Sequence, residues 1–137
     1  MARFFREIAC IIALTLLGAA FSLFSGLASL PWAEAELAAG EIRPTDARAL
    51  QVIWIDARSA ADYRTEHIPA AIYLNQEHWE TGIIELMDAW LTQPRPIVVY
   101  CGSAGCGTSK RIAERLREAL PDAEIYSLKG GWDAWLR

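Results

Sequence analysis

The sequence predicts an α/β domain with a mostly parallel sheet covered by helices on both faces, preceded by one transmembrane helix. Three observations lead to this prediction. Short β-branched and aromatic runs alternate with helical stretches after about residue 41. Residues 97–100 are continuously apolar, which is typical of a central parallel strand buried on both faces. Residues 8–30 contain no acidic or basic side chain.

The apolar segment 8–30 is long enough to cross a bilayer. A helix of this length reaches roughly 34 Å, against a hydrocarbon core of about 30 Å. Arg3 and Arg6 precede it, and acidic residues follow it, so the positive-inside rule keeps residues 1–7 cytoplasmic. We therefore expect a signal anchor in the inner (plasma) membrane, a connector over residues 31–40 and an extracytoplasmic, periplasmic domain over residues 41–137. A membrane protein partner of unknown identity fits this location.

A cleaved secretory signal is the alternative interpretation of the same segment. Ala33-Glu34-Ala35 offers an Ala-x-Ala cleavage pattern, and cleavage would release a secreted periplasmic domain. The apolar run is longer than the usual signal core of about 7 to 15 residues, which favours the uncleaved anchor.

The first half of the domain contains two predicted strand and helix pairs. Residues 52–56 form a β-branched run, after a helix start at Pro44 and before a helical stretch over residues 59–64. Residues 71–75 form the second strand. Residues 79–91 predict an amphipathic helix, with these apolar residues recurring on one face: Ile83, Ile84, Met87, Trp90 and Leu91.

The second half repeats the alternation. The central strand 97–100 runs into a glycine-rich loop, and a helix over about residues 108–120 follows, with Ile112, Leu116 and Leu120 spaced by four. Residues 124–128 form the last predicted strand, and Gly130-Gly131 turns the chain into a short terminal amphipathic segment.

Cys101 is the candidate nucleophile because it follows the central strand, where sites in parallel sheets lie. The glycines of the loop let backbone amides point inward, and the following helix adds its positive end. Such surroundings would stabilise a thiolate and cradle an anionic substrate or a persulfide. The alternative is a buried cysteine that packs as a small hydrophobe.

Three motifs surround this cysteine: Asp56-Ala57-Arg58, His67-Ile68-Pro69-Ala70-Ala71 and Leu128-Lys129-Gly130-Gly131-Trp132. In this order and spacing they resemble the rhodanese-like (thiosulfate:cyanide sulfurtransferase) domain family over roughly residues 41–137. The resemblance implies a five-stranded α/β domain whose Cys101 accepts sulfane sulfur from a small donor as a persulfide and passes it to a thiol acceptor. It implies no metal and no organic cofactor. The substrate-binding loop would comprise Gly102, Ser103, Ala104, Gly105, Cys106, Gly107, Thr108 and Ser109.

The loop departs from the family's common pattern in length and charge. It is longer between Cys101 and Ser109 and contains no Arg or Lys, which argues against a preference for thiosulfate. Related phosphatases and arsenate reductases clamp an oxyanion with an Arg where Gly107 stands here, so phosphatase activity is disfavoured. Lys110 and Arg111 follow the loop.

Cys106 in the same loop leaves two interpretations open. As a resolving thiol it would attack an oxidised or persulfidated Cys101 and close a reversible disulfide. As an ordinary loop residue it would have no partner. Cys10, in the apolar segment, is expected to be inert.

The remaining motif residues are interpreted as structural: Asp56, Arg58, His67, Gly130, Gly131 and Trp132. Asp56 and Arg58 would tie a strand end to neighbouring loops, and His67 would hydrogen-bond within a turn. Trp132 and Trp135 would cap the sheet.

The composition excludes several other classes of function. With 13 Lys and Arg against 17 Asp and Glu, the chain has no electrostatic footprint for nucleic acid. Three cysteines give neither a disulfide scaffold nor a structural zinc site. Two hypotheses remain. The first is an exported sulfurtransferase, and the second is a thiol-disulfide redox or non-catalytic interaction module that uses Cys101 and Cys106.

Overall fold

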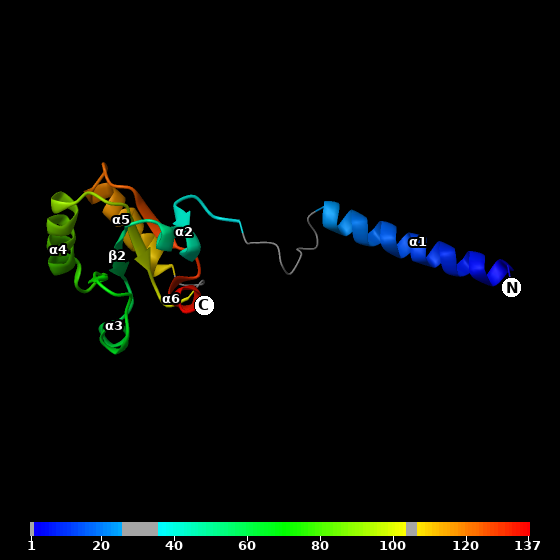
Figure 1. The fold of residues 1–137 in the computed structure, drawn as a ribbon, viewed down its shortest axis with the longest axis horizontal. Helices are drawn as coiled ribbons and strands as arrows, with labels where there is room; N and C mark the ends of the chain where they lie inside the picture. The colour runs from blue at the N-terminus through cyan, green and yellow to red at the C-terminus, as the bar shows by residue number, and fades with distance from the viewer. Residues whose placement is uncertain (1, 26–35, 104–106) are drawn as a thin grey trace. The chain divides into compact units, whose positions relative to one another are not determined.

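The computed structural model describes residues 2–25, 36–103 and 107–137 (Figure 1). The chain divides into two compact units, Met1–Glu36 and Leu37–Arg137. The boundary falls within residues 31–40, the predicted connector.

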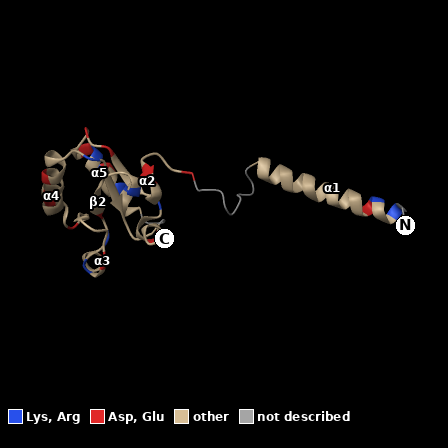
Figure 2. Ribbon diagram, viewed as in Figure 1, with Lys and Arg blue, Asp and Glu red and all other residues tan. Residues whose placement is uncertain are grey.

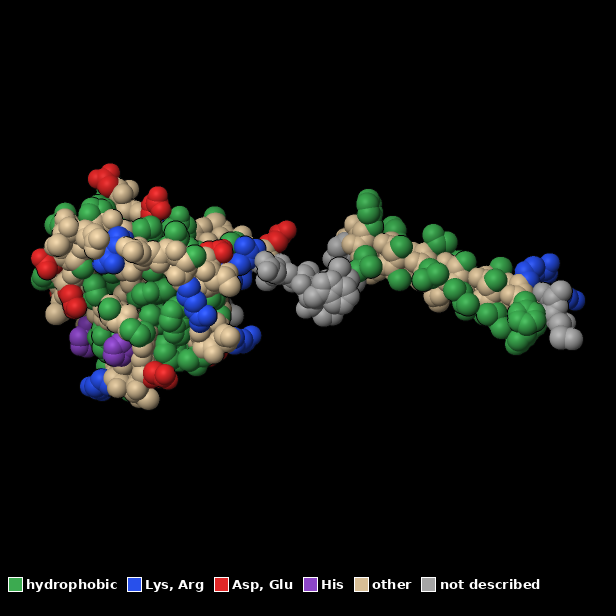
Figure 3. Space-filling view, in the orientation of Figure 1, with side chains coloured by type: hydrophobic (Ala, Val, Ile, Leu, Met, Phe, Trp, Pro, Cys, Tyr) green, Lys and Arg blue, Asp and Glu red, His purple; other side chains and the backbone are tan. Residues whose placement is uncertain are grey.

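The first unit is the helix α1, Ala2–Phe24. Its stretch Arg3–Phe24 is 22 residues long with a mean hydropathy of 2.1, and none of it is buried. Figures 2 and 3 show charge confined to the N-terminal end and apolar side chains along the rest. The Thr15 hydroxyl donates to the Ile11 and Ile12 carbonyls, which satisfies this polar group within the helix. One helix of this chain is therefore long and apolar enough to span a membrane.

The helix lies earlier in the chain than the predicted segment 8–30. It includes the basic residues Arg3 and Arg6, because a helix continues through charged residues where water can solvate them. Residues 26–30 of that segment and the cleavage pattern at residues 33–35 lie outside the described residues.

The second unit contains a sheet of five parallel strands in the order β1-β5-β4-β2-β3. The strands are β1 Glu41–Ile42, β2 Ile53–Asp56, β3 Ile72–Tyr73, β4 Ile97–Tyr100 and β5 Ile125–Leu128. The central strand β4 is buried over its whole length, as its continuous apolar run predicts. The predicted α/β class with a parallel five-stranded sheet is confirmed.

The edge strand β1 gave no signal of its own in the sequence. It contains only two residues, paired with Ser127 and Leu128 of β5, and two residues cannot show an alternating pattern. The sheet is parallel throughout because each connection crosses over the sheet and returns the chain to the end at which the previous strand began.

Helices cover both faces of the sheet, as predicted (Figure 1). The helices α4 (Trp79–Thr92) and α5 (Thr108–Ala119) pack over Ile55 and Val99 on one face. The helices α2 (Pro44–Ala49) and α6 (Gly131–Trp135) cover the other face, where Tyr100 is fully buried. The short helix α3, Ala60–Thr65, follows the carboxyl end of β2.

The helix α4 presents a face to the sheet that matches the predicted one only in part. Ile83 and Trp90 pack against the core as predicted, but Ile84 and Leu91 are 69% and 66% exposed, and Gly82 and Leu86 are buried instead. A Cβ at Gly82 would come within 2.8 Å of the Tyr73 carbonyl oxygen, so this glycine marks where the helix touches β3. The close backbone contact sets the rotation of α4, and the count of apolar residues does not reveal it.

Candidate active site

The strand β4 delivers Cys101 to the carboxyl edge of the sheet. Only 2% of this residue is exposed. The Trp132 amide donates to its carbonyl oxygen at 2.7 Å, and the Asp133 amide donates to the Gly102 carbonyl at 3.2 Å. The first turn of α6 therefore fixes the backbone on which the thiol stands, from a segment some thirty residues further along the chain.

Gly131 makes this close approach of α6 possible. Its φ is +57°, and a Cβ would lie 2.3 Å from the Cys101 carbonyl oxygen. Gly130, the N-cap of α6, also has a positive φ of 78°. Both positions need glycine because an L side chain would be strained there. A Cβ at Gly131 would also collide with the cysteine's own peptide group, and a Cβ at Gly130 would lie 2.7 Å from the Ala134 Cβ.

The thiol itself contacts two serines of the predicted substrate-binding loop. Its Sγ lies 3.4 Å from Ser109 Oγ and donates to the Ser103 carbonyl oxygen at 3.6 Å. Ser109 Oγ in turn lies 2.9 Å from Ser127 Oγ on β5. Ser109 and Ser127 are 3% and 4% exposed, so the two hydroxyls form a buried chain that ends on the sulfur.

Ser127 was not singled out by the sequence. The available signal was a serine within the apolar strand IYSL, at a position whose alternation predicts burial. A buried hydroxyl needs a partner, and Ser109 is the partner that the fold provides.

The helix α5 begins beside the thiol at Thr108, after the N-cap residue Gly107. Its first turn has backbone amides without intrahelical partners, so its positive end faces the site. Gly102, Ser103 and Gly107 are described on either side of the loop. Ala104, Gly105 and Cys106 lie outside the described residues, and so does the hypothesis that Cys106 resolves Cys101.

A buried ion pair supports the wall of the site. The Arg58 guanidinium donates to both carboxylate oxygens of Asp56, with Nη2 to Oδ2 at 2.7 Å. The Tyr100 hydroxyl donates to the same Oδ2 at 2.7 Å and accepts from the Ile68 amide at 3.1 Å. Burial raises the pKa of Tyr100, and its bond to Asp56 raises it further, so the phenol remains a donor.

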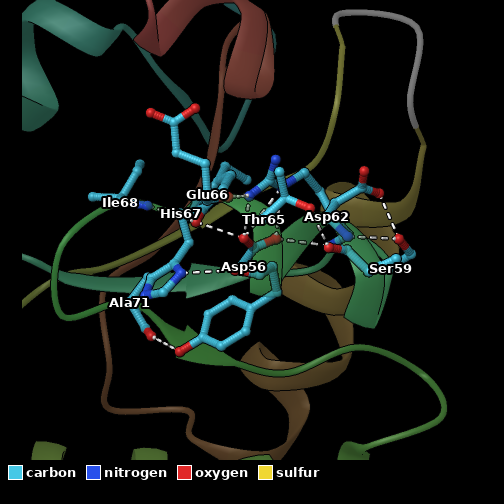
Figure 4. Close-up of polar contacts among 12 residues, drawn as sticks. Asp56, Ser59, Asp62, Thr65, Glu66, His67, Ile68 and Ala71 are labelled. Atoms are coloured by element: carbon cyan, nitrogen blue, oxygen red, sulfur yellow. Dashed lines mark hydrogen bonds and ion pairs between the residues drawn. The ribbon is translucent and has the colours of Figure 1, made fainter.

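Arg58 also joins this ion pair to α6 and to the turn before β3. Its guanidinium carbon lies 4.3 Å from the centre of the Trp132 ring, and Nη2 donates to the Glu66 carbonyl at 2.5 Å (Figure 4). Asp56, Arg58 and Trp132 therefore form one connected group beneath Cys101.

His67 lies in the turn before β3. Its Nδ1 is 2.8 Å from the Tyr63 carbonyl oxygen, and its ring stacks on the Tyr63 ring at a centroid distance of 4.1 Å. The Tyr63 hydroxyl donates to the Ala71 carbonyl at 2.8 Å. Among the described residues, those that line the cavity at Cys101 do not include His67.

A cavity of about 390 Å³ opens over the thiol. Its lining comes from the segments after β2, β3 and β4, from the helix α3 and from the start of α5: Ala57, Arg58, Ser59, Asp62, Asn75, Gln76, Glu77, Cys101, Gly102 and Thr108. Such a volume suits a small substrate. Gly102 and Thr108 of the predicted substrate-binding loop are among these residues. The sequence gave no reason to single out Asp62, Asn75 or Glu77.

Glu41 holds the two lysines nearest the active loop. Lys110 Nζ and Lys129 Nζ each lie 2.9 Å from one of its carboxylate oxygens. The hydrogen bonds from Lys110 and then Lys129 lower the pKa of Glu41 to about 2. The site thus combines a buried thiol, two buried hydroxyls and a helix N-terminus, with these neighbouring lysines in ion pairs.

Comparison with known proteins identifies the domain. The sequence pattern of the family described as "Rhodanese-like domain" matches residues 31–137. The chain belongs to the rhodanese-like family. The predicted resemblance is therefore confirmed, and the motifs around Cys101 are those of a rhodanese-like domain.

A relative of this rhodanese-like domain is a named sulfurtransferase. Thiosulfate sulfurtransferase GlpE of Pseudomonas savastanoi pv. phaseolicola (strain 1448A / Race 6) is 28% identical over 97 residues, which are 69% of this chain and 84% of that protein. The relative and the family match together support a function within the sulfurtransferase family.

Solved structures show the same fold. A thiosulfate sulfurtransferase from Pseudomonas aeruginosa superposes with a TM-score of 0.53 and 22% identity, covering 74% of this chain and 19% of that one. An As-Sb reductase from Leishmania major superposes with a TM-score of 0.58 and 20% identity, covering 69% of this chain and 74% of that one.

Proposed function

We propose that this rhodanese-like domain is a sulfurtransferase that carries sulfane sulfur as a persulfide on Cys101. The supporting observation is the position of the thiol. Its Sγ lies at the inner end of a cavity, 3.4 Å from the Ser109 hydroxyl and beside the first turn of α5. These groups stabilise negative charge on sulfur, both on the resting thiolate and on the outer atom of a persulfide.

In the first half-reaction, the thiol loses its proton to water and the Cys101 thiolate attacks the sulfane sulfur of the donor. A new sulfur–sulfur bond forms at Sγ. The donor's own bond to that sulfur breaks, and its electron pair leaves with the rest of the donor. The transferred sulfur is already at the oxidation level of sulfane sulfur in the donor, so the step consumes no separate oxidant or reductant.

In the second half-reaction, an acceptor thiolate attacks the outer sulfur of the persulfide. The bond to Sγ breaks, and its electron pair returns to Cys101 as a thiolate. Ser109 serves both halves by donating to whichever sulfur carries the charge, and Ser127 orients the Ser109 hydroxyl from behind. Ser127 is thus a positioning residue.

We further propose that α1 anchors the enzyme in a membrane, with the domain outside the cytoplasm. The length and hydropathy of Arg3–Phe24 support the span, and the basic residues at its N-terminal end support the orientation. A reporter enzyme that is active only outside the cytoplasm, fused after Arg137, should be active in intact cells. Inactivity would contradict export, and a shortened mature chain would favour a cleaved signal over an anchor.

Intact mass spectrometry tests the chemistry on the full chain in a non-ionic detergent. The protein is incubated with thiosulfate, 3-mercaptopyruvate or a polysulfide, and wild type is compared with Cys101→Ser and Cys106→Ser. A gain of one sulfur in wild type and Cys106→Ser, absent from Cys101→Ser, is the expected result.

Two other outcomes contradict the proposal. A loss of two hydrogens that requires both cysteines would make the domain a thiol-disulfide module. An unchanged mass under every donor would make it a non-catalytic interaction module.

A further inference from the structure

The cavity at Cys101 is electrostatically divided along its depth. Its inner end faces the start of α5, a twelve-residue helix whose first-turn amides favour one negative charge at the reacting sulfur. Two acidic residues, Asp62 and Glu77, also line the cavity, and because they are exposed whereas Cys101 is buried, they belong to its outer part. The part of a donor beyond the sulfane sulfur must therefore occupy space beside two negative side chains.

Local hydrogen bonds hold the backbone at both acidic residues in place. The Ser59 hydroxyl donates to Asp62 Oδ2 at 2.5 Å, and the Asp62 amide donates back to Ser59 Oγ at 3.2 Å (Figure 4). The Glu77 amide donates to Asn75 Oδ1 at 2.9 Å. Both residues are solvent-exposed.

The neighbouring cations do not offset these charges. Arg58 lines the cavity, but its guanidinium is bound by the buried carboxylate of Asp56, and the pair is neutral as a unit. Lys110 and Lys129 share the single carboxylate of Glu41, so this group keeps one net positive charge, but none of the three residues lines the cavity. Among the described lining residues, Asp62 and Glu77 are the acidic ones that no lining cation pairs with.

Arg111 carries a positive charge near Thr108, at the edge of the cavity, and opposes the charge of the two acidic residues. Its Nη2 donates to the Thr108 hydroxyl at 3.3 Å, and its side chain is exposed. Solvent and salt screen an exposed guanidinium as they screen the two carboxylates, so one such charge at the edge does not reverse the sign set by two in the lining.

We propose that Asp62 and Glu77 set the donor class of this site. The preferred donors carry a neutral or cationic group next to the sulfane sulfur, and the dianion thiosulfate is selected against. This inference rests on the proposed function and names its substrate class. An ammonium group on the donor would lie among the carboxylates while the sulfane sulfur meets the inner amides.

Three donors with the same reacting group make the test. Thiosulfate is a dianion, methanethiosulfonate is a monoanion, and 2-aminoethanethiosulfonate is a zwitterion without net charge. In each, the Cys101 thiolate takes the terminal sulfur, the bond between the two donor sulfurs breaks, and its electron pair leaves as sulfite or a sulfinate. Cyanide then removes the outer sulfur as thiocyanate, which is measured for the full chain in a non-ionic detergent at low salt.

Wild type should have the highest kcat/KM with the zwitterion and the lowest with thiosulfate. Asp62→Asn and Glu77→Gln should each raise the ratio of kcat/KM for thiosulfate to that for the zwitterion by about 5- to 10-fold, the size expected for two units of donor charge about 7 Å from one carboxylate in a water-like dielectric. Added salt should shrink the difference. Glu118→Gln removes one exposed carboxylate from α5 outside the cavity lining and is the matched control, with an unchanged ratio.

The outcomes separate this inference from the function on which it depends. The assignment of Asp62 and Glu77 is overturned if all three donors transfer sulfur and neither variant changes the ratio of kcat/KM values. It is also overturned if Glu118→Gln changes this ratio as much as Asp62→Asn or Glu77→Gln does. Failure of every donor to place sulfur on Cys101 contradicts the proposed function itself.

Discussion

Replacing Gly131 by alanine should disrupt the backbone that holds the reactive cysteine. A left-handed conformation costs an L residue about 1 to 2 kcal/mol, and Gly131 has a φ of +57°. The added Cβ would lie 2.3 Å from the Cys101 carbonyl oxygen, a backbone atom that can only move away by breaking its 2.7 Å bond from the Trp132 amide. Loss of that bond adds about 1 kcal/mol. We therefore expect Gly131→Ala to lower the unfolding free energy of the domain by about 2 to 3 kcal/mol.

Urea unfolding of the full chain, followed by tryptophan fluorescence, measures this change because Trp132 and Trp135 pack on the same core cluster as Tyr100. Gly102→Ala is the control, since a Cβ there meets nothing within 4 Å and the backbone is not left-handed. Sulfur transfer should fall at least tenfold in Gly131→Ala under conditions where it remains folded, because the thiol shifts with its own carbonyl. A stability within about 0.5 kcal/mol of Gly102→Ala would refute the reasoning.

Three further predictions follow from the buried polar groups. Tyr100→Phe should lower the unfolding free energy by about 1 to 3 kcal/mol, because Asp56 loses a buried donor; an unchanged urea midpoint would contradict this. Ser127→Ala should slow alkylation of Cys101 near neutral pH by about 3- to 10-fold, the effect of losing one hydrogen bond behind the Ser109 hydroxyl, and should shift the pH profile of the reaction upward. The pKa of Glu41 is lowered from 4.5 to about 2 by its lysine partners, so its contribution to stability is complete above about pH 4.5 and is lost as the pH falls toward 2. Glu41→Gln should therefore remove part of the acid sensitivity seen in unfolding measured across that interval, and an identical acid profile would show that the lysine pairs carry no such linkage.

The sequence predicted the class of fold because each central element carries its own signal. The continuous apolar run of β4 and the spacing of Ile112 and Leu116 on α5 each identify an element locally. The strand β1 and the rotation of α4 had no such local signal. The first depends on pairing with β5, and the second depends on contact between Gly82 and the Tyr73 backbone, which periodicity does not encode.

The same distinction applies to the site. The position of Cys101 after a strand and before a helix was visible in the sequence, because parallel sheets place functional residues there. Ser127, Asp62 and Glu77 come from other strand ends and loops. Their proximity to the thiol exists only once the strand order β5-β4-β2-β3 brings those ends to one edge. A pattern read along the chain does not contain that order.

The bonds from α6 to the cysteine backbone also set the sequence of assembly. Synthesis runs from the N-terminus, and α6 follows all five strands of the sheet. The carbonyl of Cys101 therefore has no Trp132 amide to accept from while the sheet itself is being made. The segment that holds the reactive cysteine is also the one that closes the sheet face around Tyr100, so chemical reactivity at Cys101 should be acquired only when α6 docks and that part of the core is completed.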